Sequence, residues 1–326
     1  MNPVAVLPWL SDPLARFEAR MARGQTPQGL LIHGPVGCGR RHLALSIAAR
    51  LLESDWRPSP DMDGDELPGV PHPDFWVVGI EGEAKSQIKV DQIRELNHVL
   101  NMTSHQRGRK VAMIFPAEAM NPNAANTFLK TLEEPSEGTT VLLVATSAAR
   151  LPATVLSRCE RLRITPPGHD LALSWLAAGY PDRAVCERAL AYATGAPLLA
   201  RSLLGDGDGK SSTSKALTEL GTDLQQLVDR SVTPIAVART WARRDSGVCL
   251  RWLYLQTAAL IGDSQAESGA KLFSLKIPRA AVNMAACFAY LDQVVEAQRL
   301  KDRSLNMEAA FADLLMWWYG AAGATR

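Results

Sequence analysis

A glycine-rich run near the N-terminus has the spacing of a loop that binds phosphate. The run GPVGCGRR, residues 34–41, follows a short apolar segment and precedes a segment with helical periodicity. In such loops the backbone N–H groups and the N-terminus of the following helix form a cradle for an anion. The glycines Gly34, Gly37 and Gly39 therefore predict a P-loop frame, with an unrelated turn between a strand and a helix as the alternative.

Two arginines stand where a working P-loop has its reactive side chains. A lysine that reaches the β- and γ-phosphates and a Ser or Thr that holds Mg²⁺ normally follow the last glycine, but here Arg40 and Arg41 do. A guanidinium attracts phosphate, yet its planar fork does not replace a compact ammonium, and it cannot ligate Mg²⁺. We therefore expect a degenerate site, formed by these arginines and the three glycines, that holds no productive ATP.

The acidic half of such a site is also missing from its expected position. The apolar run 111–115 leads into Phe115 and Pro116, where two acids would bind Mg²⁺ and activate water. Glu118 follows, and we interpret it as a surface glutamate that begins a helix, with a displaced acid as the alternative. Both observations predict that the chain does not hydrolyse ATP at its own site.

The elements that must position these residues follow from the hydrophobic pattern. Strand-length apolar runs alternate with helical stripes at residues 30–33, 75–80, 111–115, 141–145 and 162–164. This alternation predicts a parallel five-stranded sheet flanked by helices. Asn121 and Pro122 have the types of an N-cap and a first helical residue, and the prolines at 166–167 end this α/β part.

The remainder of the chain has helical patterns without strand alternation. Short helices are expected up to about residue 204, and the segment 205–212, GDGDGKSS, has the composition of a flexible linker. Phe311, Leu314, Leu315 and Trp318 form the clearest helical stripe. We predict three domains, namely an α/β domain over 1–166, a helical lid over 167–207 and an all-α domain over 208–326.

Composition limits the partners and the compartment. Lys and Arg number 35 against 34 Asp and Glu, so the net charge is +1 and any contact with nucleic acid must be local. The five cysteines have no pairwise spacing typical of zinc or of a disulfide framework. Because neither a signal-peptide pattern nor an apolar run of spanning length is visible, we expect a cytoplasmic protein that does not associate with a membrane.

Residues 110–167 resemble the AAA+ module of bacterial clamp-loader subunits. Three features carry the resemblance: the run NTFLKTLEEP at 126–135, a strand that ends before Thr146 and Ser147, and the triplet SRC at 157–159. The resemblance covers about residues 1–205. It implies an α/β P-loop (AAA+) domain, a small helical lid and a C-terminal helical collar that joins a five-subunit ring.

The resemblance also implies roles for single residues. Arg158 corresponds to the arginine finger that acts in trans on ATP bound by the next subunit, with Ser157 and Cys159 as its motif context; a surface ion pair is the alternative. Such fingers are worth roughly 10³ to 10⁵ in rate where measured. Thr146 and Ser147 occupy the place of a phosphate sensor, but we expect them to satisfy backbone groups at the strand end.

The resemblance finally implies partners and cofactors. The partners are ATPase subunits of the gamma/tau type, a delta-like subunit, the sliding clamp and primer-template DNA, in a hetero-oligomer. ATP is expected on a partner subunit. Zinc is not expected, because residues 39–158 contain no cysteine, and the acidic segment 54–74 is interpreted as a solvated loop, with cation chelation as the alternative.

The implied function is a noncatalytic subunit that helps load the sliding clamp onto primed DNA, within a DNA-directed DNA polymerase holoenzyme. Two alternatives stay open, an active AAA+ ATPase or remodeller and an AAA+-fold interaction module outside replication.

Overall fold

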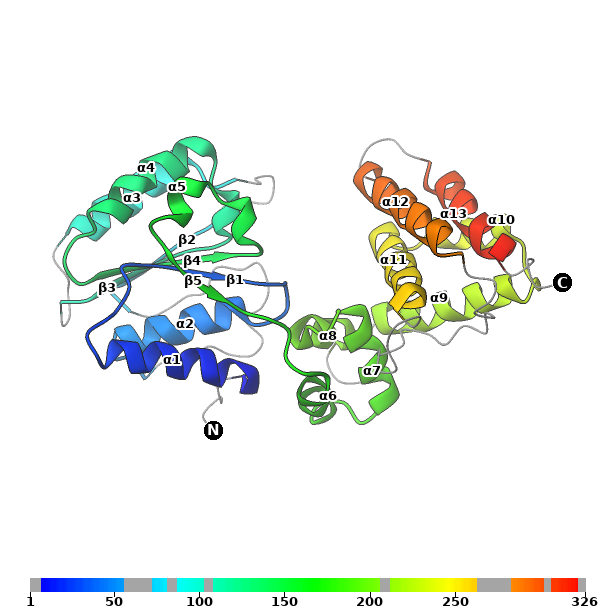
Figure 1. Ribbon diagram of the computed structural model, residues 1–326, viewed down its shortest axis with the longest axis horizontal. Helices are drawn as coiled ribbons and strands as arrows, with labels where there is room; N and C mark the ends of the chain where they lie inside the picture. Colours follow the sequence, from blue (N-terminus) through cyan, green and yellow to red (C-terminus); the bar gives the residue numbers. More distant parts are fainter. Residues whose placement is uncertain are drawn as a thin grey trace. The chain divides into compact units, whose positions relative to one another are not determined.

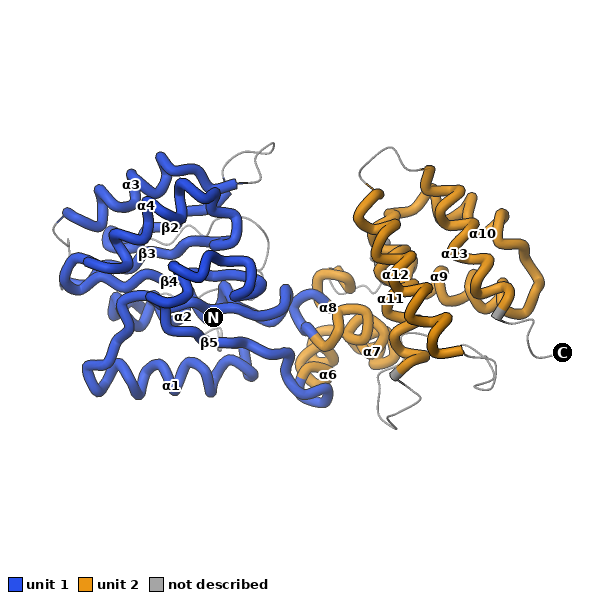
Figure 2. The backbone as a smooth tube through the Cα atoms, turned by 45° about the horizontal axis from the view of Figure 1, so that its top comes forward, with its two compact units in different colours: residues 1–171, 196–199 blue, residues 172–195, 200–326 orange. Residues whose placement is uncertain are grey.

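The structure is a computed structural model that describes residues 7–55, 72–80, 87–102, 108–205, 212–262, 283–301 and 306–321. The chain divides into two compact units (Figure 2), residues 1–171 with 196–199 in unit 1 and residues 172–195 with 200–326 in unit 2. The finer division into 1–166, 167–207 and 208–326 stays a prediction. Residues 206–211 of the expected linker and 56–71 of the acidic segment lie outside the described residues.

Unit 1 contains a five-stranded sheet in the order β2-β3-β4-β1-β5, in which every neighbouring pair is parallel. The predicted α/β fold class with a parallel five-stranded sheet is confirmed. The strands are β1 (Gly29–His33), β2 (Phe75–Val78), β3 (Lys110–Ile114), β4 (Thr139–Ala145) and β5 (Glu160–Arg163). Because all strands run the same way, the loops that follow β1, β3 and β4 meet at one edge of the sheet.

The predicted strand positions differ from the structure most at the edge of the sheet. All seven residues of β4 are buried, so the apolar run locates this central strand, although Thr139 and Thr140 extend it toward its start. Strand β5 begins at Glu160, two residues before the predicted start. It is an edge strand whose charged residues are exposed, so its pattern lacks the apolar run of a strand covered on both faces.

Helices cover both faces of the sheet (Figure 1), with α1 (Ser11–Met21) and α2 (Arg40–Leu51) on one face and α3 (Val90–Asn101) and α4 (Pro122–Glu133) on the other. Phe128 and Leu132 of α4 pack into a buried cluster that includes Leu31 and Leu143 of the sheet. The predicted cap of α4 is confirmed, because the Asn121 side chain accepts a hydrogen bond from the backbone N–H of Ala124.

All regular secondary structure in the described part of unit 2 is helical. Together with the segment that enters it, its helices are α6 (His169–Ala177), α7 (Arg183–Tyr192), α8 (Pro197–Leu204), α9 (Ser212–Val228), α10 (Pro234–Trp241), α11 (Ser246–Gly262), α12 (Met284–Leu300) and α13 (Met307–Ala321). No described helix has the length and apolar character needed to cross a bilayer.

Aromatic side chains form the centre of the unit 2 core. The ring of Trp241 makes edge-to-face contacts with Trp252 and Phe311 at centroid distances of 6.2 and 5.8 Å. The indole N–H of the buried Trp318 donates a hydrogen bond of 3.0 Å to the hydroxyl of Tyr290. All four residues of the predicted stripe on α13 are buried in this core, which confirms the stripe.

Candidate functional site

The glycine loop joins β1 to α2, and its glycines are needed for close packing. Gly37 and Gly39 have φ of +78° and +85°, a region that favours glycine. A Cβ at Gly37 would lie 2.4 Å from the Cβ of Leu199, whose neighbour Leu198 donates a backbone hydrogen bond to the Gly37 carbonyl at 3.0 Å. The loop therefore has the strand-loop-helix context of the predicted P-loop frame, with one side packed against residues 198–199 of the same unit.

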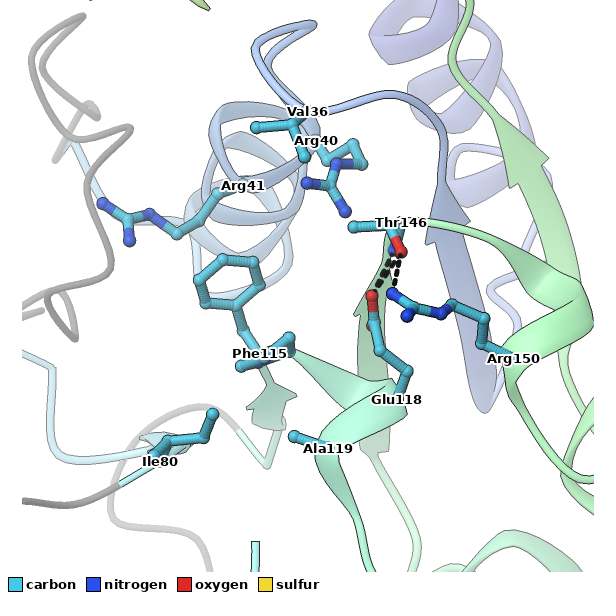
Figure 3. Close-up of a pocket in the computed structure, with 10 residues that line it drawn as sticks. Val36, Arg40, Arg41, Ile80, Phe115, Glu118, Ala119, Thr146 and Arg150 are labelled. Carbon is cyan, nitrogen blue, oxygen red and sulfur yellow. Dashed lines mark hydrogen bonds between the residues drawn. The ribbon is translucent and has the colours of Figure 1, made fainter. Parts of the chain in front are cut away.

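The two arginines after the loop are buried in the first turn of α2. Arg40 and Arg41 are 7% and 4% exposed. The guanidinium of Arg41 lies over the ring of Phe115, 5.4 Å from its centroid. Figure 3 shows that Arg40 turns toward Thr146, whereas Arg41 extends away from it. A cation–π contact therefore occupies Arg41, at the position where a Mg²⁺-binding hydroxyl would stand.

A pocket of about 610 Å³ lies beside this turn, at the carboxyl edge of the sheet. Its lining residues are Val36, Arg40, Arg41, Ile80, Phe115, Pro116, Glu118, Ala119, Thr146 and Arg150. Phe115 and Pro116 directly follow β3, so a ring and a proline line the pocket where carboxylates would bind Mg²⁺. Of the described residues that line it, three are arginines and one is a glutamate, a net positive charge, whereas a Mg²⁺ site needs several oxygen ligands.

Among the described residues that line this pocket, Glu118 supplies the carboxylate, and the expectation of a surface glutamate is wrong in this respect. The residue belongs to the short 3₁₀ turn η2 (Ala117–Ala119) and is half-buried. Its Oε1 accepts hydrogen bonds from the backbone N–H of Thr146 at 2.9 Å and from the Thr146 hydroxyl at 2.5 Å. Its Oε2 is buried and accepts no hydrogen bond from the residues that the structure describes. Sequence spacing does not predict this contact, because the two residues are 28 positions apart.

Thr146 and Ser147, expected to form hydrogen bonds with backbone groups at the end of β4, make different contacts. The hydroxyl of Ser147 accepts a hydrogen bond of 3.3 Å from the backbone N–H of Ala149, the local role that was predicted. The Thr146 hydroxyl instead binds Glu118 and lies 3.4 Å from Nη1 of Arg150. Thr146 therefore connects a carboxylate and a guanidinium within the pocket.

Arg158 lies at the opposite end of the sheet from this pocket. In the parallel register Leu30 pairs with Glu160 and His33 with Arg163, so Arg158 lies beside the start of β1. The run from Gly29 to Gly34 spans roughly 16 Å at about 3.3 Å per residue. Of the candidate residues, the structure therefore brings together the glycines with Arg40 and Arg41, and places the SRC triplet apart from them.

The SRC triplet combines an exposed arginine with a buried thiol. The Arg158 side chain is 34% exposed, and the hydroxyl of Ser157 donates a hydrogen bond of 3.0 Å to the Thr154 carbonyl. Cys159 is buried next to Gly29, and burial raises the pKa of its thiol to about 11. The thiol is therefore protonated at neutral pH, which disfavours a nucleophilic role.

One residue near the triplet was not found from the sequence. Glu133, the last residue of α4, forms an ion pair with Arg158 in which Nη2 lies 2.5 Å from Oε1. The residue belongs to the LEEP run that supported the resemblance, but nothing in that run indicates which cation it binds.

Potential metal ligands do not cluster within the described ranges: no group of three or more His, Cys, Asp or Glu side chains could hold a metal there. Most of the acidic segment 54–74 lies outside those ranges, so its interpretation as a solvated loop stays a prediction.

Similarity to known proteins extends over most of the chain. A family model described as DNA polymerase III, delta subunit, matches residues 10–168. The DNA polymerase III subunit delta' of Pseudomonas aeruginosa is 35% identical over 72% of this chain and 71% of that protein. The subunits of the same name from Haemophilus influenzae and Escherichia coli are 32% and 31% identical, over 62% and 52% of this chain and 63% and 52% of those proteins.

A solved structure was also compared with this chain. A DNA polymerase III gamma subunit-related protein of Thermotoga maritima aligns over 96% of this chain and 99% of that chain, with 17% identity and a TM-score of 0.45. The two alignments with the Haemophilus and Escherichia subunits cover less than two thirds of those proteins. On its match to the Pseudomonas subunit over more than two thirds of both proteins, the chain belongs to the family of DNA polymerase III delta-prime subunits.

Proposed function

We propose that this chain is a noncatalytic clamp-loader subunit that helps load a sliding clamp onto primed DNA and donates Arg158 in trans to a neighbouring ATPase subunit. The position of Arg158 carries the proposal. An exposed guanidinium at the far end of the sheet cannot serve the pocket of its own chain, but it can meet a nucleotide held by another subunit. There it would stabilise the charge that develops on the γ-phosphate.

The pocket at the other end of the sheet supports the noncatalytic part of the proposal. Arg40 and Arg41 replace the lysine and the hydroxyl, and Phe115 stands where a Mg²⁺-binding acid would be. Two separate requirements for Mg²⁺-ATP are therefore unmet. ATP would be bound by the partner subunit, and this chain would contribute no hydrolysis of its own.

The partners follow from the same proposal. They are ATPase subunits of the gamma/tau type, a delta-like subunit, the sliding clamp and primer-template DNA, with residues 208–326 as the collar that joins the ring. A net charge of +1 suits a subunit whose main surfaces face other proteins. Salt-dependent DNA binding would then belong mainly to the assembled complex.

Reconstitution of the loader with Arg158→Ala tests this function. We expect the variant to assemble and to load clamps more slowly, because the finger is removed, whereas the partly exposed ion pair that it forms with Glu133 contributes little to folding stability. Arg20→Ala is the matched control, since Arg20 is an arginine of unit 1 with similar exposure that pairs with Glu160. Equal clamp loading by the two variants would contradict the proposal.

One observation favours the alternative of an active ATPase. The Glu118 carboxylate lies in the pocket, although its Oε1 is held by Thr146. ATP turnover by the purified chain with Mg²⁺, abolished by Glu118→Gln, would establish that alternative; we expect no turnover above that of a blank.

A further inference from the structure

Three groups of the same chain hold the guanidinium of Arg158. Nη1 donates hydrogen bonds to the Thr154 carbonyl at 2.9 Å and to the Ser157 hydroxyl at 3.1 Å. Nη2 donates to Oε1 of Glu133 at 2.5 Å. Both terminal nitrogens therefore already make hydrogen bonds within the free subunit.

Helix stability does not explain the position of Glu133. It is the last residue of α4, where the helix dipole disfavours a negative charge. The same helix turn is anchored by Leu132, which is buried against the sheet, so the backbone at Glu133 has a fixed place. The negative charge of Glu133 is therefore held in an unfavourable place, and the ion pair with Arg158 compensates it.

The exposure of the pair allows it to exchange. The side chains of Arg158 and Glu133 are 34% and 49% exposed. Ion pairs of this kind contribute little to folding stability and are screened by solvent. A phosphate carries more negative charge than one carboxylate and binds a guanidinium through two adjacent N–H groups, so it competes directly with Glu133 for Nη2.

We propose that Glu133 is a positioning residue that latches Arg158 while the neighbouring nucleotide site is empty and releases it to the γ-phosphate when ATP is bound there. This inference rests on the proposed function of Arg158. Because the ion pair must separate before Arg158 contacts ATP, the free energy of ATP binding is reduced by the free energy of that pair. Glu133 thereby sets the ATP concentration at which the neighbouring site becomes active, without taking part in the chemical step.

The test compares steady-state ATP hydrolysis by loaders reconstituted with wild-type, Glu133→Gln and Glu134→Gln chains. Glutamine keeps the shape of the side chain and removes the competing charge. Glu134 is an adjacent exposed carboxylate with no ion pair to Arg158, so it is the matched control. We expect Glu133→Gln to lower KM for ATP by roughly two- to five-fold, the size of an exposed ion pair, with kcat unchanged. Glu134→Gln should match the wild type.

Two further variants separate a latch from a structural role. Glu133→Lys should lower KM in the same direction as Glu133→Gln, because it also removes the competing carboxylate. In the Arg158→Ala background, Glu133→Gln should have no further effect, since no guanidinium remains to be released. An effect of Glu133→Gln that persists without Arg158 would overturn the latch.

The outcomes distinguish the latch from the proposed function. If Arg158→Ala slows hydrolysis while Glu133→Gln leaves KM at the wild-type value, the latch is wrong and the finger stands. A fall in kcat with constant KM for Glu133→Gln likewise overturns the latch, because it would mean that Glu133 orients the finger during the reaction. If Arg158→Ala has no effect, the proposed function fails and the latch fails with it.

Discussion

Three arginines of unit 1 differ in what surrounds the guanidinium. Arg40 and Arg41 are buried in the first turn of α2, and Arg41 lies over an aromatic ring. Arg158 is partly exposed and holds a carboxylate on the surface of its own chain. The residue type is the same, but burial places the first two in a pocket and leaves the third accessible to a partner.

The sequence alone singled out the arginines as candidates, because the motifs that contain them are local. The loop glycines and the SRC triplet are contiguous, so their spacing is visible without a fold. The contacts of Glu118 with Thr146 and of Glu133 with Arg158 were missed, since the partners are 28 and 25 positions apart in the chain. The spacing of residues within a local motif cannot predict contacts between residues that are distant in the chain.

At the residue scale, restoring two side chains should not restore the nucleotide site. In Arg40→Lys with Arg41→Thr, the lysine and the hydroxyl of a P-loop return, but Phe115 and Pro116 still stand directly after β3, where an acid would bind Mg²⁺. We expect calorimetry to find no Mg²⁺-dependent gain in ATP affinity for this double variant. Adding Phe115→Asp should produce that gain, because it supplies an oxygen ligand for Mg²⁺. A Mg²⁺-dependent gain in the double variant would point instead to Glu118 as the acid.

At the element scale, basic groups gather where the edge strand β5 pairs with the end of β1. Arg163 pairs with His33 in the register, and Arg161 lies two residues earlier on β5. Partial burial of His33 lowers the pKa of its imidazole below the usual 6.5, and the two arginines lower it further. The apolar pattern did not locate the start of β5, because the charged residues of this edge strand face solvent.

The low pKa of His33 should make the folding stability of unit 1 decrease in acid. Because the pKa of His33 is lower in the folded state, the unfolded chain binds more protons below pH 6.5, and stability falls as the pH drops through that value. We expect His33→Gln to give a shallower fall in the urea midpoint between pH 7 and pH 5 than the wild type. Parallel pH profiles for the two proteins would show that His33 does not titrate as described.

At the scale of the whole molecule, two units have separate hydrophobic cores. The buried cluster of unit 2 combines the aromatic residues of α10 to α13 with leucines of α9, and that of unit 1 is mostly aliphatic and lies between the sheet and its helices. The sequence predicted the change from α/β to helical structure, because periodicity changes at the prolines after β5. It could not predict which helices share a core, since that depends on contacts distant in the chain.

Damage to one core should therefore leave the other intact. Phe311→Ala removes a fully buried ring that contacts Trp241, and we expect it to destabilise unit 2 by about 3–5 kcal/mol. Hydrogen exchange should accelerate in α9 to α13 and stay unchanged in the sheet. Met316→Ala, on the exposed face of the same helix, should change little. Equal loss of protection in both units would mean that they unfold as one.

The central claim is that this chain completes the ATP site of a neighbour and hydrolyses no ATP itself. Pre-steady-state release of phosphate by the reconstituted loader tests it most directly, with the wild-type chain, Arg158→Ala or Arg20→Ala in otherwise identical complexes. We predict that Arg158→Ala removes the fast phase that belongs to the adjoining ATPase subunit, where a finger is worth roughly 10³ to 10⁵ in rate. Arg20→Ala should keep that phase. An unchanged fast phase in Arg158→Ala would contradict the account.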